Sequence, residues 1–216
     1  MIPASPRLME KKLIDFIVKG GIVMYPIILC SVIALAIFVE RMWILRKKTV
    51  IPSDLVVAVE EHLKKSNIKG AMEVCDRSDS SIAKIFLAGL KNSGKGMWLV
   101  KEAIEERGGR ESVILEKNVG ILSTIANLST LLGLLGTVSG MIKTFKVISS
   151  QGGGNPSLLA GGIAEALITT AAGLCVAIPV LVGYRILKDK ADSLIFEMEE
   201  SSMKIIEIME STSNQE

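Results

Sequence analysis

The stretch from residue 118 to residue 142 carries no charged side chain between Lys117 and Lys143. At a rise of about 1.5 Å per residue, a helix of this length crosses a hydrocarbon core of roughly 30 Å. A segment of this kind belongs in a membrane, and it constrains the fold more than any other part of the sequence.

This stretch is unusual for a membrane span because small and polar residues recur along one side of the expected helix. Steps of three and four residues place them on one face: Ser123, Ala126, Thr130, Gly133, Thr137, Gly140 and Thr144. A face toward lipid needs no such residues. A face packed closely on other helices, or lining a polar path, does.

Two further uncharged runs cover residues 20–39 and 162–184, the second interrupted only by Glu165. Basic clusters follow both runs and favour cytoplasmic ends there. The overall hydrophobic content of 49% agrees with a membrane protein. We therefore expect three transmembrane helices, with the N-terminus outside and the C-terminus in the cytoplasm.

The expected fold is an all-α membrane protein in which spans two and three extend into a cytoplasmic helical bundle. Helical periodicity places short helices at 53–65, 68–77 and 80–91, then a helix from 97 interrupted at Gly108-Gly109. For residues 1–19 a cleavable signal peptide is the alternative interpretation, although no cleavage site is evident. The expected boundaries are an N-terminal interfacial amphipathic helix at 1–19, transmembrane helix 1 at 20–40, a cytoplasmic helical domain at 41–117, transmembrane helix 2 at 118–146, a periplasmic turn at 147–157, transmembrane helix 3 at 158–184 and a cytoplasmic tail at 185–216.

Composition and motifs argue against several classes of function. A net charge of +2 and 4% aromatic residues do not fit nucleic-acid binding. The cysteines and His62 form no metal-ligand pattern, so we expect no metal and no cofactor. The glycines at 133, 136 and 140 resemble a phosphate loop but lack its lysine. We expect no enzymatic activity.

The third span also has a small-residue side, formed by Gly162, Ala166, Thr170, Gly173 and Ala177. Close helix approach needs small residues on both partners, so the two small sides can simply pack together. Alternatively, Thr137 and Thr170 present hydroxyls to a hydrated or partner-filled path. Both interpretations give the same residues to the helix-packing surface or pore wall: Gly133, Gly136, Gly140, Ala166, Gly173 and Ala177.

Glu165 is the only acid inside the three apolar runs. A charge at membrane depth costs at least about 2.5 kcal/mol, so it pairs, becomes protonated or meets water. An acid near a helix N-terminus, favoured by the dipole, is the alternative. No Asp lies within any predicted span, so either another subunit supplies a titratable carboxylate or the protein conducts nothing.

Two stretches resemble the ExbB/TolQ/MotA family of inner-membrane motor proteins: LSTLLGLLGTVSGMIKTF at 128–145 and GGIAEALITTAAGLCVAIPVLVGY at 161–184. The resemblance implies a ring-shaped homo-oligomer, typically a pentamer, around a dimeric single-span partner of the ExbD/TolR type whose helix supplies an Asp. Proton flow past this Asp moves one component against the other, and a TonB/TolA-like protein carries force to the outer membrane.

In this resemblance the pore-facing threonines of the family correspond to Thr137 and Thr170, and its third-span glutamate to Glu165. The implied location is the inner membrane of a Gram-negative bacterium. Three spans favour ExbB or TolQ over four-span MotA, with ExbB slightly ahead. A passive helical scaffold and a small transporter are the competing classes of function.

Overall fold

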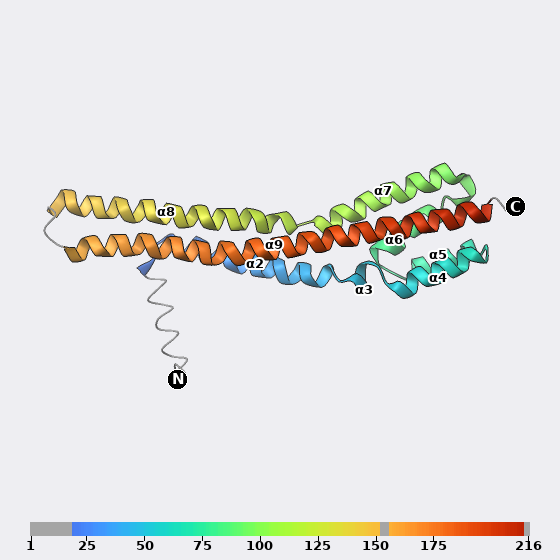
Figure 1. The fold of residues 1–216 in the computed structure, drawn as a ribbon, viewed down its shortest axis with the longest axis horizontal. Coiled ribbons are helices and arrows are strands. Elements are labelled where there is room, and N and C mark those ends of the chain that lie inside the picture. The colour runs from blue at the N-terminus through green and yellow to red at the C-terminus, as the bar shows by residue number, and fades with distance from the viewer. Residues whose placement is uncertain (1–18, 152–155, 214–216) are drawn as a thin grey trace, which may run out of the picture. The chain divides into compact units, whose positions relative to one another are not determined.

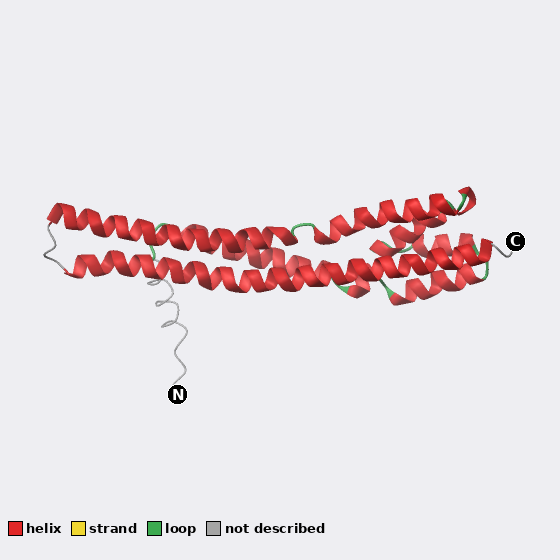
Figure 2. Cartoon of the chain, turned by 45° about the horizontal axis from the view of Figure 1, so that its top comes forward, coloured by secondary structure: helices red, strands yellow, loops and turns green. Residues whose placement is uncertain are grey.

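A computed structural model describes residues 19–151 and 156–213. The predicted N-terminal amphipathic helix and the centre of the predicted periplasmic turn lie outside these residues. The described residues contain helices and no strand (Figure 2). In chain order the helices are α2 (Met24–Ile44), α3 (Lys47–Val50), α4 (Ser53–Lys64), α5 (Ile68–Asp76), α6 (Ser81–Leu90), the 3₁₀ turn η1 (Ser93–Lys95), α7 (Met97–Glu116), α8 (Val119–Gln151) and α9 (Pro156–Ser213).

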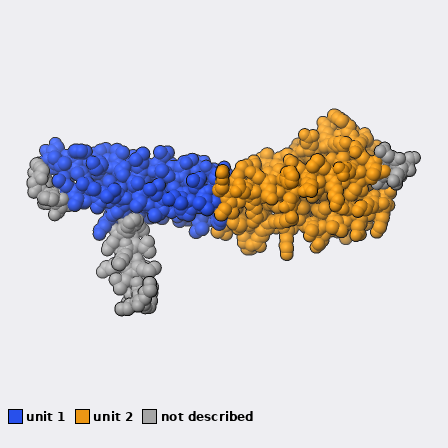
Figure 3. Space-filling model, viewed as in Figure 1, with its two compact units in different colours: residues 1–38, 120–184 blue, residues 39–119, 185–216 orange. Residues whose placement is uncertain are grey.

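The chain divides into two compact units, coloured separately in Figure 3. Unit 1 combines the residues up to 38 with residues 120–184, and unit 2 combines 39–119 with the residues from 185. The uncharged runs fall in unit 1, whereas the charged helices fall in unit 2. Both α2 and α9 contribute residues to each unit.

In unit 1, α8 and the first half of α9 run side by side (Figure 1), and the start of α2 packs against them. The core there combines residues of all three helices: Val23, Met24, Ile27 and Ala172, with Leu132 and Val176 packed against them. Many large apolar side chains point outward instead, and Leu131 and Phe145 are 61% and 62% exposed. Outward apolar faces of this extent need hydrocarbon or another protein chain to cover them.

Three stretches are long and apolar enough to cross a membrane: Met24–Ile44, Met97–Ser150 and Leu159–Ser211. This agrees with the three predicted spans. The third lies on one continuous helix of 58 residues. The prediction that the third span continues into the tail as a helix is therefore confirmed.

The expected interruption of the helix at Gly108-Gly109 is wrong. Helix α7 continues through both glycines to Glu116, and the chain breaks at Lys117 and Asn118 instead. Two glycines cost a helix about 1 kcal/mol each. Ion pairs one turn apart bridge them, from Arg107 to Glu111 and from Arg110 to Glu106.

Asn118 explains where the break occurs. Its φ is +62°, in the left-handed region that asparagine tolerates better than most residues. Helix α7 therefore ends at Glu116, and α8 begins separately at Val119. Helix α4 begins at Ser53, as the periodicity predicts, and Pro52 takes its N-cap position.

Unit 2 is a small helical bundle with an apolar core and a charged surface. Phe86 and Ile82 of α6 are fully buried with Leu187, Met198 and Ile205 of α9. Ion pairs add to this packing, with Nζ–O distances of 2.7 Å for Lys204–Glu60 and 2.6 Å for Lys47–Glu197. The expectation that the third span extends into a helical bundle is therefore confirmed.

Cys75 in α5 offers a test of the packing of unit 2. Its side chain is 1% exposed, and burial raises the pKa of its thiol to about 12. At pH 8 the thiolate fraction is then on the order of 10⁻⁴, so alkylation is slow. In a Cys30→Ala/Cys175→Ala variant, we expect maleimide to label Cys75 only after a denaturant unfolds unit 2. Rapid labelling of the native protein would contradict the packing described here.

Candidate functional site

The contact between α8 and α9 in unit 1 is made by small residues whose backbones approach closely. A Cβ added at Gly140 would lie 2.7 Å from the carbonyl oxygen of Gly162, and one at Gly173 would lie 2.6 Å from that of Ser129. Backbone atoms cannot move aside as a side-chain tip can, so these positions require glycine. The small sides of both helices thus meet within one chain.

The contact is centred one residue away from the predicted face at several positions. Gly136 lies against Thr169, which is fully buried, whereas Thr130 and Thr137 lie beside the contact. Ser129 is also fully buried there, and its hydroxyl makes no hydrogen bond within the described residues. Neighbouring helix residues differ by only 100° in direction, so periodicity alone does not select between them.

The two threonines predicted to line a path occupy different surroundings. The hydroxyl of Thr170 donates to the carbonyl oxygen of Gly133 on α8, at 2.9 Å. The hydroxyl of Thr137 donates to the carbonyl oxygen of Leu134 in its own helix, at 2.6 Å. Thr170 therefore joins the two helices, while Thr137 lies on a partly exposed surface of α8.

The predicted wall residues are distributed along this contact. Gly133, Gly140 and Gly173 meet the facing backbone directly, and Gly136 meets the side chain of Thr169. Ala166 lies against Gly140, and Ala177 is buried further along α9. In this chain Gly133, Gly136, Gly140, Ala166 and Gly173 pack one helix on the other.

Glu165 lies where three segments of unit 1 meet. Its carboxylate forms an ion pair with the ammonium of Lys143 on α8. Gly21, in the turn before α2, has a φ of +67°, and a Cβ there would collide with the carboxylate oxygen of Glu165. The Glu165 side chain is 19% exposed.

The helix-dipole interpretation of Glu165 does not hold. Helix α9 begins at Pro156, more than two turns before Glu165, and the dipole effect is confined to the first turn. The acid is balanced by Lys143 instead. The sequence does not reveal this pair, because Lys143 and Glu165 lie 22 residues apart on different helices.

Among the described residues of unit 1, Glu165 is the only Asp or Glu. The described part of the chain also contains no group of His, Cys, Asp and Glu that could hold a metal ion. A proton relay needs a succession of titratable groups. Among the described residues, unit 1 therefore has one acid, which is already paired, and the hydroxyls of Thr137, Thr169 and Thr170 are bonded to backbone carbonyls.

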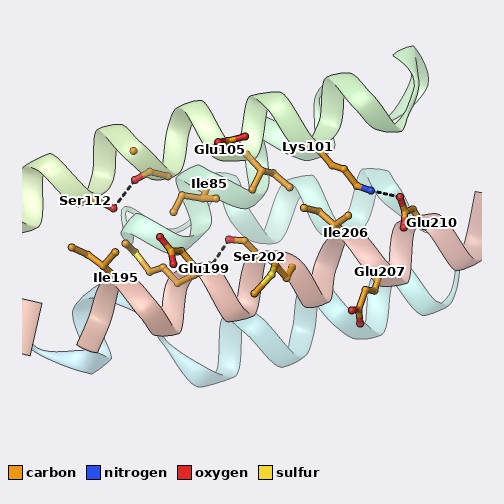
Figure 4. A pocket seen from close by; sticks show the side chains of 15 residues that line it. Ile85, Lys101, Glu105, Ser112, Ile195, Glu199, Ser202, Ile206, Glu207 and Glu210 are labelled. Carbon is orange, nitrogen blue, oxygen red and sulfur yellow. Dashed lines mark hydrogen bonds and ion pairs between the residues drawn. The ribbon is translucent and has the colours of Figure 1, made fainter. Parts of the chain in front are cut away.

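Unit 2 contains a groove of about 720 Å³ between α6, α7 and α9 (Figure 4). Its apolar residues include Ile85 and Ile206, and Lys101 and Glu210 form an ion pair at 2.5 Å. The hydroxyls of Ser112 and Ser202 donate to backbone carbonyls of their own helices at 2.9 and 2.7 Å. Neither serine is paired with a base, so the groove has no nucleophile of this kind.

Comparison with known proteins matches residues 77–200 to the model of the MotA/TolQ/ExbB proton channel family. The matched region includes the whole α8–α9 contact. A protein of Synechocystis sp. named as biopolymer transport protein ExbB-like 1 is 37% identical over 185 residues, which cover 82% of this chain and 70% of that protein.

Two other relatives carry functional names. The biopolymer transport protein exbB1 of Vibrio cholerae is 28% identical over 196 residues, covering 83% of this chain and 80% of its own. The Tol-Pal system protein TolQ of Pseudomonas aeruginosa is 33% identical over 128 residues, covering 54% of this chain and 55% of its own.

Gly140→Ala tests the close approach of α8 and α9. Alanine gains about 1 kcal/mol of helix propensity, but its Cβ meets the backbone of Gly162, and overpacking costs about 1–3 kcal/mol. We expect a lower melting temperature in detergent. Gly120→Ala on the same helix is the control, because nothing lies within 4 Å of its Cβ. Equal melting temperatures for both variants would rule out the backbone contact.

Proposed function

We propose that this chain, which belongs to the MotA/TolQ/ExbB proton channel family, is the ring-forming subunit of a proton-driven membrane motor. The observation that carries the proposal is the acid content of unit 1. Glu165 is the only Asp or Glu among the described residues there, and Lys143 neutralises it. A proton path through this unit therefore needs a carboxylate from another chain.

The proposed partner is a single-span protein of the ExbD/TolR type whose membrane helix carries an Asp. Such a helix would pass the partly exposed hydroxyl of Thr137, with Thr170 and Glu165 near the path. A hydroxyl bonded to its own backbone offers a polar surface without a fixed charge, so a partner helix can move along it. In this proposal a TonB/TolA-like protein takes the force to the outer membrane.

The proposed assembly is a homo-oligomeric ring, typically a pentamer in this family. Support comes from the apolar residues that the single chain leaves uncovered on α8, such as Leu131, Leu134 and Phe145. The small-residue sides already pack within the chain, so neighbouring copies and lipid would cover these outer faces. Identical subunits that repeat one head-to-tail contact form a ring when the rotation between neighbours closes after a whole turn.

We place the protein in the inner membrane of a Gram-negative bacterium, with its N-terminus periplasmic and its C-terminus cytoplasmic. The basic residues after the first and third spans support this orientation. Energised import of a biopolymer is the preferred process, because the ExbB-named relatives match more of the chain than the TolQ relative does. Maintenance of the cell envelope is the TolQ-type alternative, and no enzymatic activity is proposed.

A passive helical scaffold is the second candidate. The observation in its favour is that Thr170 and the glycines of both helices are engaged within the chain itself. In that case the polar residues serve only to pack helices, and no partner acid passes them.

Thr137→Val separates the two candidates because valine keeps the shape of threonine but removes its hydroxyl. We expect the variant to assemble normally. In cells that depend on this protein, it should lose most of the energised uptake, meaning the import across the outer membrane that the proton gradient drives. Glu165→Ala should also lose function while the protein remains in the membrane. The matched control is Thr124→Val, since the hydroxyl of Thr124 also donates to a carbonyl of its own helix, that of Gly120. Full uptake by the Thr137 variant would favour the scaffold.

A further inference from the structure

Glu165 is held by residues of three separate segments of unit 1. Lys143 pairs with its carboxylate from α8, and Gly21 lies over the same oxygen from the turn that leads into α2. The hydroxyl of Thr169 donates to the backbone carbonyl of Glu165 at 2.6 Å and fixes this turn of α9. The side chain and its backbone are thus both constrained from within the chain.

The two members of the ion pair differ in exposure. The Lys143 side chain is 52% exposed, whereas that of Glu165 is 19% exposed. A long lysine stem can cross apolar surface while its ammonium stays near water. The carboxylate is therefore sheltered and depends on this one cation for compensation, since the described residues give it no second ion pair.

Gly21 completes the enclosure. Its φ of +67° is a conformation that side-chain-bearing residues rarely adopt, and any Cβ would collide with Oε1 of Glu165. The turn approaches the carboxylate as closely as it does only because residue 21 has no side chain. The backbone before α2 thereby covers the ion pair on one side.

We infer that Lys143 is a positioning residue that holds Glu165 as a fixed counter-charge, so that Glu165 does not itself carry the proton. The inference rests on the proposed function, in which Glu165 lies near the ion path. A carboxylate paired and covered within its own chain is suited to fixing the outer ends of α8 and α9 and the charge there. The proton then moves on the partner's acid.

Removing the cation tests this inference. We expect Lys143→Gln to lower energised uptake severalfold, because it leaves a sheltered carboxylate without its partner. Lys143→Arg should retain most of the uptake, since it keeps the charge. The matched control is Lys146→Gln, which removes an exposed lysine of the same helix that has no ion pair among the described residues.

Exchanging the charges tests whether Glu165 is only a counter-charge. In the double variant Lys143→Glu/Glu165→Lys the pair is reversed but intact, and we expect uptake well above that of either single variant. Oligomer formation on native gels identifies variants that fail to assemble. Where Lys143→Gln does not assemble, Lys143→Arg and the double variant decide the question.

The possible failures are distinguishable. Wild-type uptake in Lys143→Gln, or equal losses in Lys143→Gln and Lys143→Arg, would overturn the role of the ion pair. An assembled double variant without uptake would show that the carboxylate must be at position 165, which overturns the counter-charge and leaves the proposed function standing. Full uptake in Glu165→Ala would instead remove Glu165 from the proposed function.

Discussion

The close contact of the α8 and α9 backbones is the constraint on which unit 1 depends. Between helices in lipid there is little hydrophobic driving force, so association relies on packing and on hydrogen bonds. Gly140 against Gly162 and Gly173 against Ser129 let the backbones touch, and Thr170 adds a hydroxyl bond across the contact. A single methyl group at such a position meets backbone atoms that cannot move aside.

This contact also decides which groups remain available to other chains. The glycines and Thr169 are buried in the contact, whereas Thr137 and a broad apolar surface remain outside it. Unit 2 is stabilised differently, by a buried apolar core like that of a water-soluble helical bundle and by ion pairs such as Lys204–Glu60. The chain therefore combines two parts. The membrane part has one acidic side chain among its described residues, and the charged helical bundle includes the C-terminal tail.

The coarse fold could be predicted from the sequence because uncharged runs and helical periodicity are strong local signals. The three long apolar stretches and the extension of the third span into a helical bundle agree with those predictions. The two glycines alone were a misleading signal at Gly108-Gly109, because the i,i+4 ion pairs Arg107–Glu111 and Glu106–Arg110, which are also local in sequence, bridge them. Local signals failed at the break, which depends on the left-handed conformation of Asn118.

The candidate site was harder to predict for two physical reasons. Adjacent positions such as Thr169 and Thr170 lie only 100° apart on a helix, so a small-residue side does not reveal which of them is buried. The partner of Glu165 is 22 residues away in sequence, and Lys143 becomes its counter-ion only once α8 and α9 are packed. Neither relation is local, so neither leaves a motif.

In the proposed assembly Thr137 faces a helix of another protein. A photoreactive phenylalanine analogue placed at position 137, in cells that express the whole system, tests this contact. We expect a cross-link to a small single-span partner, and none to that partner from position 131, whose leucine is 61% exposed on the outer apolar surface. Cross-links from position 137 to lipid or to other copies of this chain alone would contradict it.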